Sequence, residues 1–540
     1  MTILEKNIQA LLSGVNEPLG NKLLNFIQNK TCSRFNIDEN LNIYDKTHNV
    51  FMYENLEEEL NFFYQSILEK TPRYPFVCIY GIGNALLIKN LAKHYKHLFV
   101  FESEIELFIL ALSTIDLSEE LCSGKIYLVD IEEERVDIQL LILFDMKDMF
   151  EYLSLYEMFV NNSFYKQFCE KTWCETDEFC KKNIEIVIRD SGLNSNLSFQ
   201  SYFHFLQNIP SMLESIPFQR ILSQRKNKFD NAIVVSAGPS LAKQLPLLKA
   251  CQDKAVIFCA DGALSMLEKE GIVPDYVTNL DFTDLAMKFF QNKENKTSLN
   301  ILSCATHPNV AHSLKAENCM IVLRNKALYQ RFNFNDFGYI DTGTHVSHFS
   351  YTLALALGFK NIIMIGQDLA FDEEGNSHSK GFDFGEKFSG EENIDKLKIP
   401  AYAGKGEVLT HTTWNDYRIK LEYLFACNDQ KAKFYNATEG GARINFTEEL
   451  SFKECCEKLL TKEKPKFELP KSLTKNRSDK LLVKFKEKIQ KDQENAKRFL
   501  DDALALKQIL ENILSKDFIL PLEFLEKVYQ NIENFNHSLD

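Results

Sequence analysis

The spacing of apolar residues divides the chain into regions of different structure. Between residues 231 and 365, short apolar runs alternate with stretches that have the three- and four-residue apolar spacing of helices. The runs predict strands at Ala232–Ser236, Ala255–Ala260, Tyr276–Leu280, Ile301–Cys304, Met320–Leu323 and Ile362–Ile365. The stretches between them predict helices at Leu241–Ala250, Leu264–Gly271 and Val346–Leu357. This alternation favours an α/β fold with a central Rossmann-like, mostly parallel sheet covered on both faces.

The N-terminal region shows the same pattern on a smaller scale. An apolar run at Phe76–Tyr80 leads into the turn Gly81–Asn84, a helical stretch follows, and a second apolar run ends at Glu102. A strand, a glycine turn, a helix and a strand with a terminal acid form the outline of a dinucleotide or adenosylmethionine site. Because no third glycine follows, we favour a Rossmann-like unit kept for packing or docking.

Helical patterns surround these two regions and set the expected domain boundaries. Residues 145–225 carry aromatic residues, Leu and Glu at helical spacing, which predicts a helical connector. Beyond Pro470, apolar residues recur at threes, fours and sevens, which predicts a long amphipathic helix with a shorter partner after Pro521. Packing of this helix against the rest of the chain or in a dimer is favoured over recognition of another protein. We therefore expect a smaller N-terminal α/β domain with its connector at 1–200, a central domain at 201–460 and a C-terminal helical domain at 461–540.

Composition and charge narrow the class of protein. The 540 residues are 45% hydrophobic and 26% charged, as in a folded soluble protein, and the net charge of −14 disfavours general binding to nucleic acid or an anionic membrane. No apolar run approaches the roughly 20 residues that cross a bilayer, and the start of the chain lacks the apolar core of a signal peptide. The 13 cysteines lack the spacing of a zinc site, so we expect reduced thiols, a cytoplasmic location and no metal centre.

The first strand of the central region ends in a turn that suits phosphate binding. In the turn Ser236–Ser240, Gly238 allows a ligand close to the backbone, and Ser240 is placed to cap the helix that follows. The N–H groups and dipole of that helix terminus attract an anion. No Walker sequence is present, so this is not a P-loop of that kind. A plain structural turn is the alternative.

The next two strands place polar groups at the same edge of the predicted sheet. One ends at Asp261, and the other ends at Asn279 and Asp281. Ligands of such sheets collect outside the carboxyl ends of the strands. The two carboxylates suit ribose hydroxyls and the amide suits a base or a phosphate. Capping of the helices that follow is the alternative for all three.

Three later segments complete this candidate edge. The segment Asp341–His348 gathers hydroxyls and N–H groups at a helix start, which suits an anion. Asp368 ends the next strand and is followed by a loop with His378, the usual place for a catalytic base under a lid. Farther on, Arg443 follows a double glycine and suits the charge of a phosphate leaving group. A solvated loop histidine and a surface ion pair are the alternatives for His378 and Arg443.

Taken in order, six motifs resemble one known family. They are Ser236–Leu241, Cys259–Ala263, Asn279–Asp281, Thr342–Thr344, Ile365–Phe371 and Asn436–Ile444. Together they resemble the motility-associated factor (Maf) proteins, the bacterial flagellin glycosyltransferases. The resemblance covers residues 231–446 and implies transfer of a nonulosonic acid, pseudaminic or legionaminic, to serine and threonine residues of flagellin in the cytoplasm. A CMP-activated sugar is the implied donor, with no cofactor required.

The central domain of that family is similar to bacterial sialyltransferases with a single Rossmann-like nucleotide fold, and this likeness implies residue roles. A Gly-Pro-Ser turn, a strand-end asparagine and a hydroxyl-rich helix start hold the CMP in those enzymes. The matching residues here are Gly238, Pro239, Ser240, Asn279, Gly343 and Thr344. A histidine from a flexible segment is the base in those enzymes, and the candidates for the base here are Asp368, His378 and His411.

Two other functions remain open from the sequence. The central region also resembles archaeal pterin diphosphokinases, which use ATP and magnesium; Asp261, Asp281 and Asp368 would then be the metal ligands. The long flanking regions argue against this alternative. A non-catalytic protein that binds flagellin or senses a nucleotide sugar is the other alternative.

Overall fold

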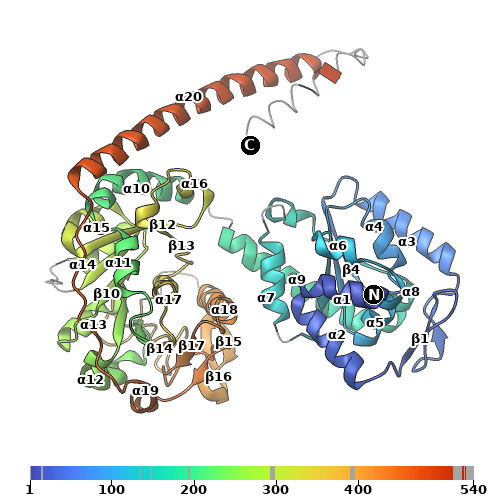
Figure 1. The fold of residues 1–540 in the computed structure, drawn as a ribbon, viewed down its shortest axis with the longest axis horizontal. Helices are drawn as coiled ribbons and strands as arrows, with labels where there is room; N and C mark the ends of the chain where they lie inside the picture. Colours follow the sequence, from blue (N-terminus) through green and yellow to red (C-terminus); the bar gives the residue numbers. More distant parts are fainter. Residues whose placement is uncertain are drawn as a thin grey trace. The chain divides into compact units, whose positions relative to one another are not determined.

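The chain forms two compact units, Met1–Leu193 and Asn194–Asp540, in a computed structural model (Figure 1). The structure describes residues 2–13, 16–133, 135–146, 149–191, 195–291, 298–388, 396–514, 526–527 and 530. The predicted boundary at residue 461 lies inside the second unit and stays a prediction. Each unit is described by itself below.

A four-stranded parallel sheet forms the centre of the first unit, in the order β6-β5-β4-β7. Its strands are β4 (Phe76–Tyr80), β5 (His97–Glu102), β6 (Ile126–Asp130) and β7 (Met158–Val160). A small antiparallel sheet precedes it, with β1 (Phe35–Ile37), β2 (Ile43–Asp45) and β3 (Val50–Phe51). Every residue of β4 and β6 is buried, as expected for parallel strands covered on both faces.

The helices of this unit surround the two sheets and continue into the connector. They are α1 (Ile3–Leu12), α2 (Glu17–Asn29), α3 (Leu56–Lys70), α4 (Leu86–Leu91), α5 (Ile105–Thr114), α6 (Ser118–Cys122), α7 (Val136–Phe144), α8 (Ser163–Phe168) and α9 (Glu170–Ser191). The predicted Rossmann-like unit is therefore confirmed. The prediction of an all-helical connector at 145–225 is wrong at Met158–Val160, because these three buried residues pair with β4.

The second unit is built on a nine-stranded sheet in which every pair of strands is parallel. The spatial order is β13-β12-β11-β10-β9-β8-β14-β17-β18. The strands are β8 (Asn231–Val235), β9 (Val256–Ala260), β10 (Tyr276–Asn279), β11 (Leu299–Ser303), β12 (Cys319–Arg324), β13 (Tyr339–Ile340), β14 (Asn361–Ile365), β17 (Lys433–Asn436) and β18 (Glu448–Glu449). All six predicted strands are confirmed to within two residues at each end, so the α/β fold class is correct.

Alternate residues of each central strand belong to two separate cores, one on each face of the sheet. Val234 of β8 packs in one core with the helices at 218–225, 346–357 and 412–426, whereas Ile233 and Val235 pack in the other core with the helices at 241–251, 264–269 and 452–459. Burying each such side chain stabilises the fold by about 1.5–3 kcal/mol. The helices of this unit are α10 (Ser195–Glu214), α11 (Phe218–Arg225), α12 (Leu241–Cys251), α13 (Leu264–Lys269), α14 (Met287–Phe290), α15 (Pro308–Ser313), α16 (Ala327–Gln330), α17 (Val346–Leu357), α18 (Thr412–Ala426) and α19 (Phe452–Leu459).

A hairpin that the sequence analysis did not predict follows β14. It consists of β15 (Lys396–Pro400) and β16 (Glu407–His411), which pair antiparallel in a sheet of their own. Its inner side chains, among them Ile399, pack against Ala370 and Ala442. The hairpin therefore holds the segment after β14 against the glycine-rich segment after β17.

The C-terminal part of the described chain is one 40-residue helix, α20 (Lys475–Leu514). Near its start, Phe485 is 9% exposed and packs against Phe205 of α10 and against Phe332. Farther along, Leu500 and Leu504 are 59% and 55% exposed. The predicted long helix is confirmed, whereas its predicted partner after Pro521 falls outside the residues described, apart from 526–527 and 530. None of the helices within the described ranges has both the length and the apolar character of a membrane span.

Candidate functional site

The order of the central sheet reverses between β8 and β14. From β8 the chain adds strands β9 to β13 on one side, and β14 and β17 then continue on the other side of β8. Ligands of open α/β sheets bind at such a switch point, outside the carboxyl ends of the strands. A pocket of about 230 Å³ lies at this position, lined by residues that include Gly238, Asp261, His345, Asp368, His378 and Trp414.

Asp368, which follows β14, is bound to the turn after β8. Its carboxylate accepts hydrogen bonds from the Ser240 hydroxyl at 2.8 Å and from the Ser240 N–H at 3.2 Å. The Ser240 side chain therefore does not cap α12, which corrects the capping role expected from the sequence. Ser379 takes over that role, because its hydroxyl accepts the Ala242 N–H at 3.1 Å. The N-terminus of α12 is thus already occupied by the protein's own groups.

Two glycines make room for Asp368, and a third makes room for the turn after β8. A Cβ atom on Gly238 would lie 2.1 Å from an Asp368 carboxylate oxygen, and one on Gly441 would lie 2.4 Å from the Asp368 Cα. Gly366 has a φ of 65°, and a Cβ there would meet the Ser236 carbonyl oxygen at 2.2 Å. The close approach expected at Gly238 is therefore made by a side chain of the protein itself. A donor-binding role for Gly238 and its neighbour Pro239 stays a prediction.

Burial raises the pKa of Asp368 from its usual 3.8 to about 6, while the hydrogen bonds from Ser240 act in the opposite direction. The side chain is only 4% exposed, yet it lines the pocket. A carboxyl group with this pKa is ionised at neutral pH and still holds a proton well enough to act as a general base. Asp368 is therefore the residue of this pocket whose chemistry is best matched to proton transfer near neutral pH.

Asp261 and Asn279 form a second polar pair at the pocket. The Asn279 amide donates to the Asp261 carboxylate, which also accepts the Gly262 N–H at 2.7 Å. Asp261 lines the pocket, whereas Asn279 lies behind it with no exposed surface and with its Oδ1 unpartnered. Asp281 does not line the pocket, and its carboxylate accepts the Thr283 N–H at 2.8 Å. This contact is a local turn and not a side-chain cap of the short helix that begins at Asp284, so neither alternative is established for Asp281. Ligand-binding roles for Asp261, Asn279 and Asp281 stay predictions.

The helix start at residues 341–348 reaches the pocket through a residue that the sequence analysis did not single out. Gly343 has a φ of 60° and packs on the ring of His348, and Thr344 follows it. Neither of these two predicted donor-binding residues lines the pocket, whereas His345 does. The N-cap position of His345 on α17 was the available signal, because an N-cap side chain lies beside the free N–H groups of the helix.

The two remaining base candidates differ in their position. His378 lines the pocket, and its ring stacks on Phe382 with centroids 3.9 Å apart. Burial lowers the pKa of His378 to about 4, so the ring is neutral at physiological pH. His411 is 2% exposed and lies beside Trp414, with ring centroids 4.2 Å apart, but it does not line the pocket itself. Asp368 and His378 therefore both line the pocket, whereas His411 contacts Trp414, which lines it.

Arg443 lies apart from these groups. It is exposed and does not line the pocket, and neither does any other arginine or lysine among the described residues. Its predicted role in neutralising a leaving group is therefore not supported by its position and stays a prediction. An anionic ligand in this pocket depends on neutral donors and helix dipoles instead.

Three further residues of the pocket were missed by the sequence analysis. Gln367 accepts the Ser236 hydroxyl at 2.9 Å, and Trp414 and Tyr417 contribute one wall from α18. Trp414 is one of only two tryptophans in the chain, which was a usable signal. Nothing in the sequence marks Tyr417, one of 20 tyrosines, as a pocket residue.

The glycine turn of the N-terminal unit is filled by tyrosine side chains. A Cβ on Gly81 would lie 2.3 Å from the Tyr165 ring, and one on Gly83 would lie 2.5 Å from the Tyr53 hydroxyl. The Tyr165 hydroxyl accepts the Gly83 N–H at 3.1 Å and donates to Glu102 at 2.6 Å. Both the N–H groups and the acid that a dinucleotide would need are thus already used, which agrees with a unit kept for packing or docking.

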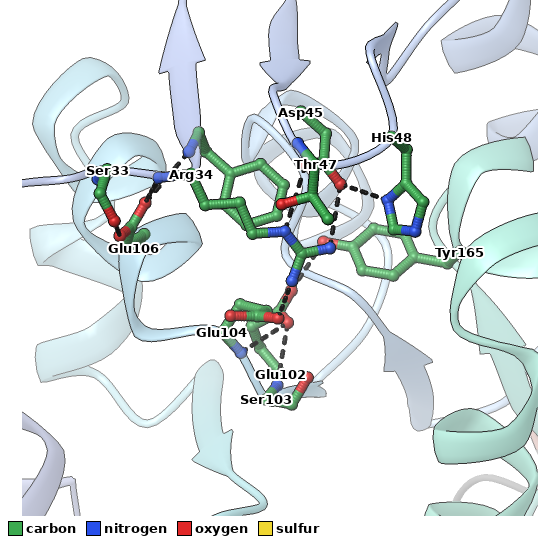
Figure 2. A network of polar contacts seen from close by, with 11 residues as sticks. Ser33, Arg34, Asp45, Thr47, His48, Glu102, Ser103, Glu104, Glu106 and Tyr165 are labelled. Atoms are coloured by element: carbon green, nitrogen blue, oxygen red, sulfur yellow. Dashed lines mark hydrogen bonds and ion pairs between the residues drawn. The ribbon is translucent and has the colours of Figure 1, made fainter.

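A polar network closes the same edge of the N-terminal sheet (Figure 2). Arg34 makes two hydrogen bonds to Asp45, at 2.9 and 3.2 Å, and a third to Glu104. Burial opposes ionisation of Asp45, but hydrogen bonds from Arg34 and His48 lower its pKa to about 2. Glu106 accepts the N–H groups of Ser33, Arg34 and Phe35. These satisfied ion pairs tie the small β1–β2–β3 sheet to β5 and α5.

Comparisons with known proteins gave one matching family model and a similar solved structure. A family model described as 6-hydroxymethylpterin diphosphokinase MptE-like matches residues 203–374, which is less than half of the chain. Among solved structures, the chain is similar to the MAf glycosyltransferase from Magnetospirillum magneticum AMB-1, with 16% identity and a TM-score of 0.46, covering 99% of this chain and 91% of that one. The family named from the motifs is thus present among the structural matches, but a likeness at this level assigns no residue role. No curated protein matches the chain.

Proposed function

We propose that the chain is a glycosyltransferase that transfers a nonulosonic acid from its CMP-activated form to serine and threonine residues of flagellin. The observation that carries the proposal is the position of Asp368. This carboxylate, with a pKa of about 6, lines a pocket at the switch point of a parallel sheet. The order of the six motifs along residues 231–446 supports the choice of sugar donor and acceptor.

In the proposed reaction, Asp368 removes the proton from the acceptor hydroxyl. The hydroxyl oxygen bonds to the anomeric carbon of the sugar as the bond from that carbon to the CMP phosphate breaks, and CMP leaves with the electron pair. CMP is already a good leaving group, so the protein's main tasks are to position the reactants and to accept one proton. His378, neutral at physiological pH, is too weak a base to compete with Asp368.

The test is the intact mass of flagellin produced together with this protein and a pathway for a CMP-nonulosonic acid. A mass increase of one or more sugar residues is expected with the wild type and is expected to be lost with Asp368→Asn. The matched control is Glu317→Gln, an exposed carboxylate before β12, at the opposite edge of the sheet. Unmodified flagellin in the presence of folded wild type and confirmed donor contradicts the proposal.

The name of the matched family model favours a second candidate, an ATP- and magnesium-dependent pterin diphosphokinase. Of its three predicted metal ligands, Asp261 and Asp368 line the pocket and Asp281 does not. Within the described ranges, no three His, Cys, Asp or Glu side chains form a group that suits a metal ion. Magnesium-dependent diphosphoryl transfer from ATP to a hydroxymethylpterin, abolished by EDTA, would establish this candidate.

A flagellin-binding protein without catalysis is the third candidate. It is excluded if the Asp368→Asn variant binds flagellin as tightly as the wild type but no longer modifies it.

We propose in addition that the C-terminal helix and the N-terminal unit bind flagellin. Deletion of residues 465–540 with full retention of flagellin modification counts against that docking role.

A further inference from the structure

Two cysteines from distant parts of the chain meet between the helices α12 and α19. Cys251 is the last residue of α12, Cys456 lies in α19, and their sulfur atoms are 3.6 Å apart although the residues are 205 positions apart in the sequence. Cys251 is 5% exposed and belongs to the core on this face of the sheet, whereas Cys456 is half-buried and packs against that core. The pair therefore has one sheltered thiol and one that a small molecule in solution can reach.

The contact between the two sulfur atoms makes their chemistry unequal. The Cys456 S–H donates to the Cys251 sulfur. This hydrogen bond lowers the pKa of Cys251, against the effect of burial, and the charge of Lys254 lowers it further. Donating the same hydrogen bond raises the pKa of Cys456, and burial adds to this effect. Because the thiolate is the nucleophile in disulfide exchange, Cys251 is the favoured nucleophile of the pair.

The two sulfur atoms are close to the separation of a covalent bond. A disulfide has its sulfur atoms about 2.05 Å apart, so bond formation needs an approach of about 1.5 Å. The two helices pack side by side (Figure 1), and α19 has only eight residues, so side-chain rotation and a small shift of α19 supply such a movement. The neighbouring Cys455 has no exposed surface and projects from α19 about 100° away from Cys456. It is therefore a matched control for Cys456.

Both helices also hold segments that enclose Asp368. At the start of α12, the Ser240 hydroxyl donates to the Asp368 carboxylate at 2.8 Å. In the first turn of α19, the Phe452 N–H donates to the Glu439 carboxylate at 3.2 Å. Glu439 precedes the double glycine, of which Gly441 lies against the backbone of Asp368. A covalent bond between the two helices therefore joins the elements that hold two sides of this carboxylate.

We propose that Cys251 and Cys456 form a reversible disulfide that fastens α19 to α12 when the thiol balance of the surroundings becomes oxidising. The oxidant is a small disulfide such as oxidised glutathione. Cys456, whose proton passes to Cys251, attacks it, forms a mixed disulfide and releases one glutathione. Cys251 then gives up its proton and attacks the Cys456 sulfur, and the second glutathione leaves. In sum, the two protein thiols lose two electrons, oxidised glutathione gains them, and both protons end on the two released glutathione thiols.

The first test is peptide mapping of the full chain after exposure to oxidised glutathione, with the remaining thiols alkylated and trypsin added without reductant. Cleavage after lysine places Cys251 in the peptide 250–254 and Cys456 in the peptide 454–458. The expected result is a linked pair of these peptides, lighter than their sum by two hydrogen atoms and separated by dithiothreitol. Absence of this pair, with both peptides carrying only glutathione or the alkylating agent, overturns the inference.

Two variants identify the cysteine that forms the link, because the peptide 454–458 also contains Cys455. The link is expected to remain in Cys455→Ala and to be lost in Cys456→Ser. A link that persists in Cys456→Ser overturns the assignment. Fragmentation of the linked wild-type peptides between residues 455 and 456 gives the same decision without any variant, so the test does not depend on the variants folding.

Thermal unfolding tests whether the bond fastens the two helices. Because it joins residues 205 positions apart, the bond restricts the unfolded chain more than the folded one. The oxidised wild type is expected to melt about 5 °C above the reduced wild type. Cys456→Ser should melt at the same temperature with and without oxidised glutathione. Equal melting temperatures for the two wild-type forms overturn the fastening of α19 to α12, even where the linked peptides are found.

Discussion

Ser240 and Asp368, which are 128 residues apart in the sequence, share a hydrogen bond that joins the turn after β8 to the residues after β14. The Ser240 hydroxyl donates at 2.8 Å to a carboxylate whose burial would otherwise raise its pKa still further. The pair therefore joins the segments that follow two adjacent strands. The hydrogen bond also helps to set the pH at which the Asp368 carboxyl group loses its proton.

Replacing Ser240 by alanine removes a donor to the ionised form of Asp368. The pKa of Asp368 should rise above its present value of about 6, because a hydrogen bond to the charged form lowers a carboxyl pKa. We expect the acidic limb of the profile of kcat/KM against pH to move to higher pH. Glu317→Gln is the control and should leave the profile unchanged. A profile of Ser240→Ala identical to that of the wild type contradicts a role of Asp368 as the base.

Replacing Asp368 by asparagine should stabilise the protein at alkaline pH while abolishing transfer. The pKa of Asp368 is higher in the folded state than its usual 3.8, so its contribution to stability is full below pH 3.8 and is lost as the pH rises through about 6. The wild type should thus gain about 1 kcal/mol relative to Asp368→Asn between pH 8 and pH 5. Denaturant unfolding of both proteins at the two pH values measures this difference, and a difference that does not change with pH argues against the raised pKa.

Replacing Gly238 by alanine should destabilise the fold by about 1–3 kcal/mol, the usual effect of forcing an extra methyl group into a packed site. The new Cβ would lie 2.1 Å from the Asp368 carboxylate and 2.6 Å from the Gly366 carbonyl oxygen. Gly20→Ala is the matched control, because Gly20 lies within helix α2 and its new Cβ would meet leucine side-chain atoms at 3.0–3.3 Å, farther away than the carboxylate and carbonyl oxygens at Gly238. Thermal unfolding checks both, and equal melting temperatures for the two variants would show that the switch point adapts without strain.

Replacing Tyr165 by phenylalanine should destabilise the N-terminal unit by about 1–3 kcal/mol, since it leaves the buried Glu102 carboxylate without its side-chain donor. Burial already raises the pKa of Glu102, and losing the Tyr165 hydroxyl should raise it further. Adding Glu102→Gln to Tyr165→Phe should recover part of the loss. Chemical denaturation of Tyr165→Phe, Glu102→Gln and the double variant gives the coupling between the two residues. Independent, additive effects would show that the 2.6 Å contact carries little energy.

The two halves of α20 should respond differently to truncation. Phe485→Ala removes a side chain that is 9% exposed and packs between α10 and Phe332, so the start of the helix should lose protection from hydrogen exchange. Leu500→Ala, at a position 59% exposed, is the control and should leave exchange unchanged. Loss of protection in both variants would show that the exposed half of α20 is covered in solution.

The six strands predicted for the central sheet, together with β4 and β5, were predictable because each is an apolar run of four to six residues. Among the missed elements, β7 and β18 have three and two residues and cannot show a period, whereas β6 is a buried five-residue run that the sequence analysis did not single out. The hairpin strand Lys396–Pro400 does alternate lysines with Leu397 and Ile399, so its signal was present but brief. Strand pairing with a neighbour, which no local pattern records, decides such cases.

The candidate site was predictable only in its location. Strand ends at Gly238, Asp261 and Asp368 were expected at one edge, and the structure brings them to one pocket. The pairing of Asp368 with Ser240 was not predictable, because it depends on how two loops far apart in sequence meet. The inclusion of His345 could not be read from residue type either, since it follows from the direction in which α17 leaves the sheet.

The glycines around Asp368 also determine when the site appears during synthesis. The segments that enclose this carboxylate come from three strands, β8, β14 and β17, and the last of them contributes Gly441. A ribosome-bound chain that ends before residue 441 therefore lacks one wall of the enclosure, so its aspartate is less buried and its pKa lies closer to the usual 3.8. The raised pKa of this one side chain is thus a reporter of completed long-range assembly, formed late because distant segments must first be brought together.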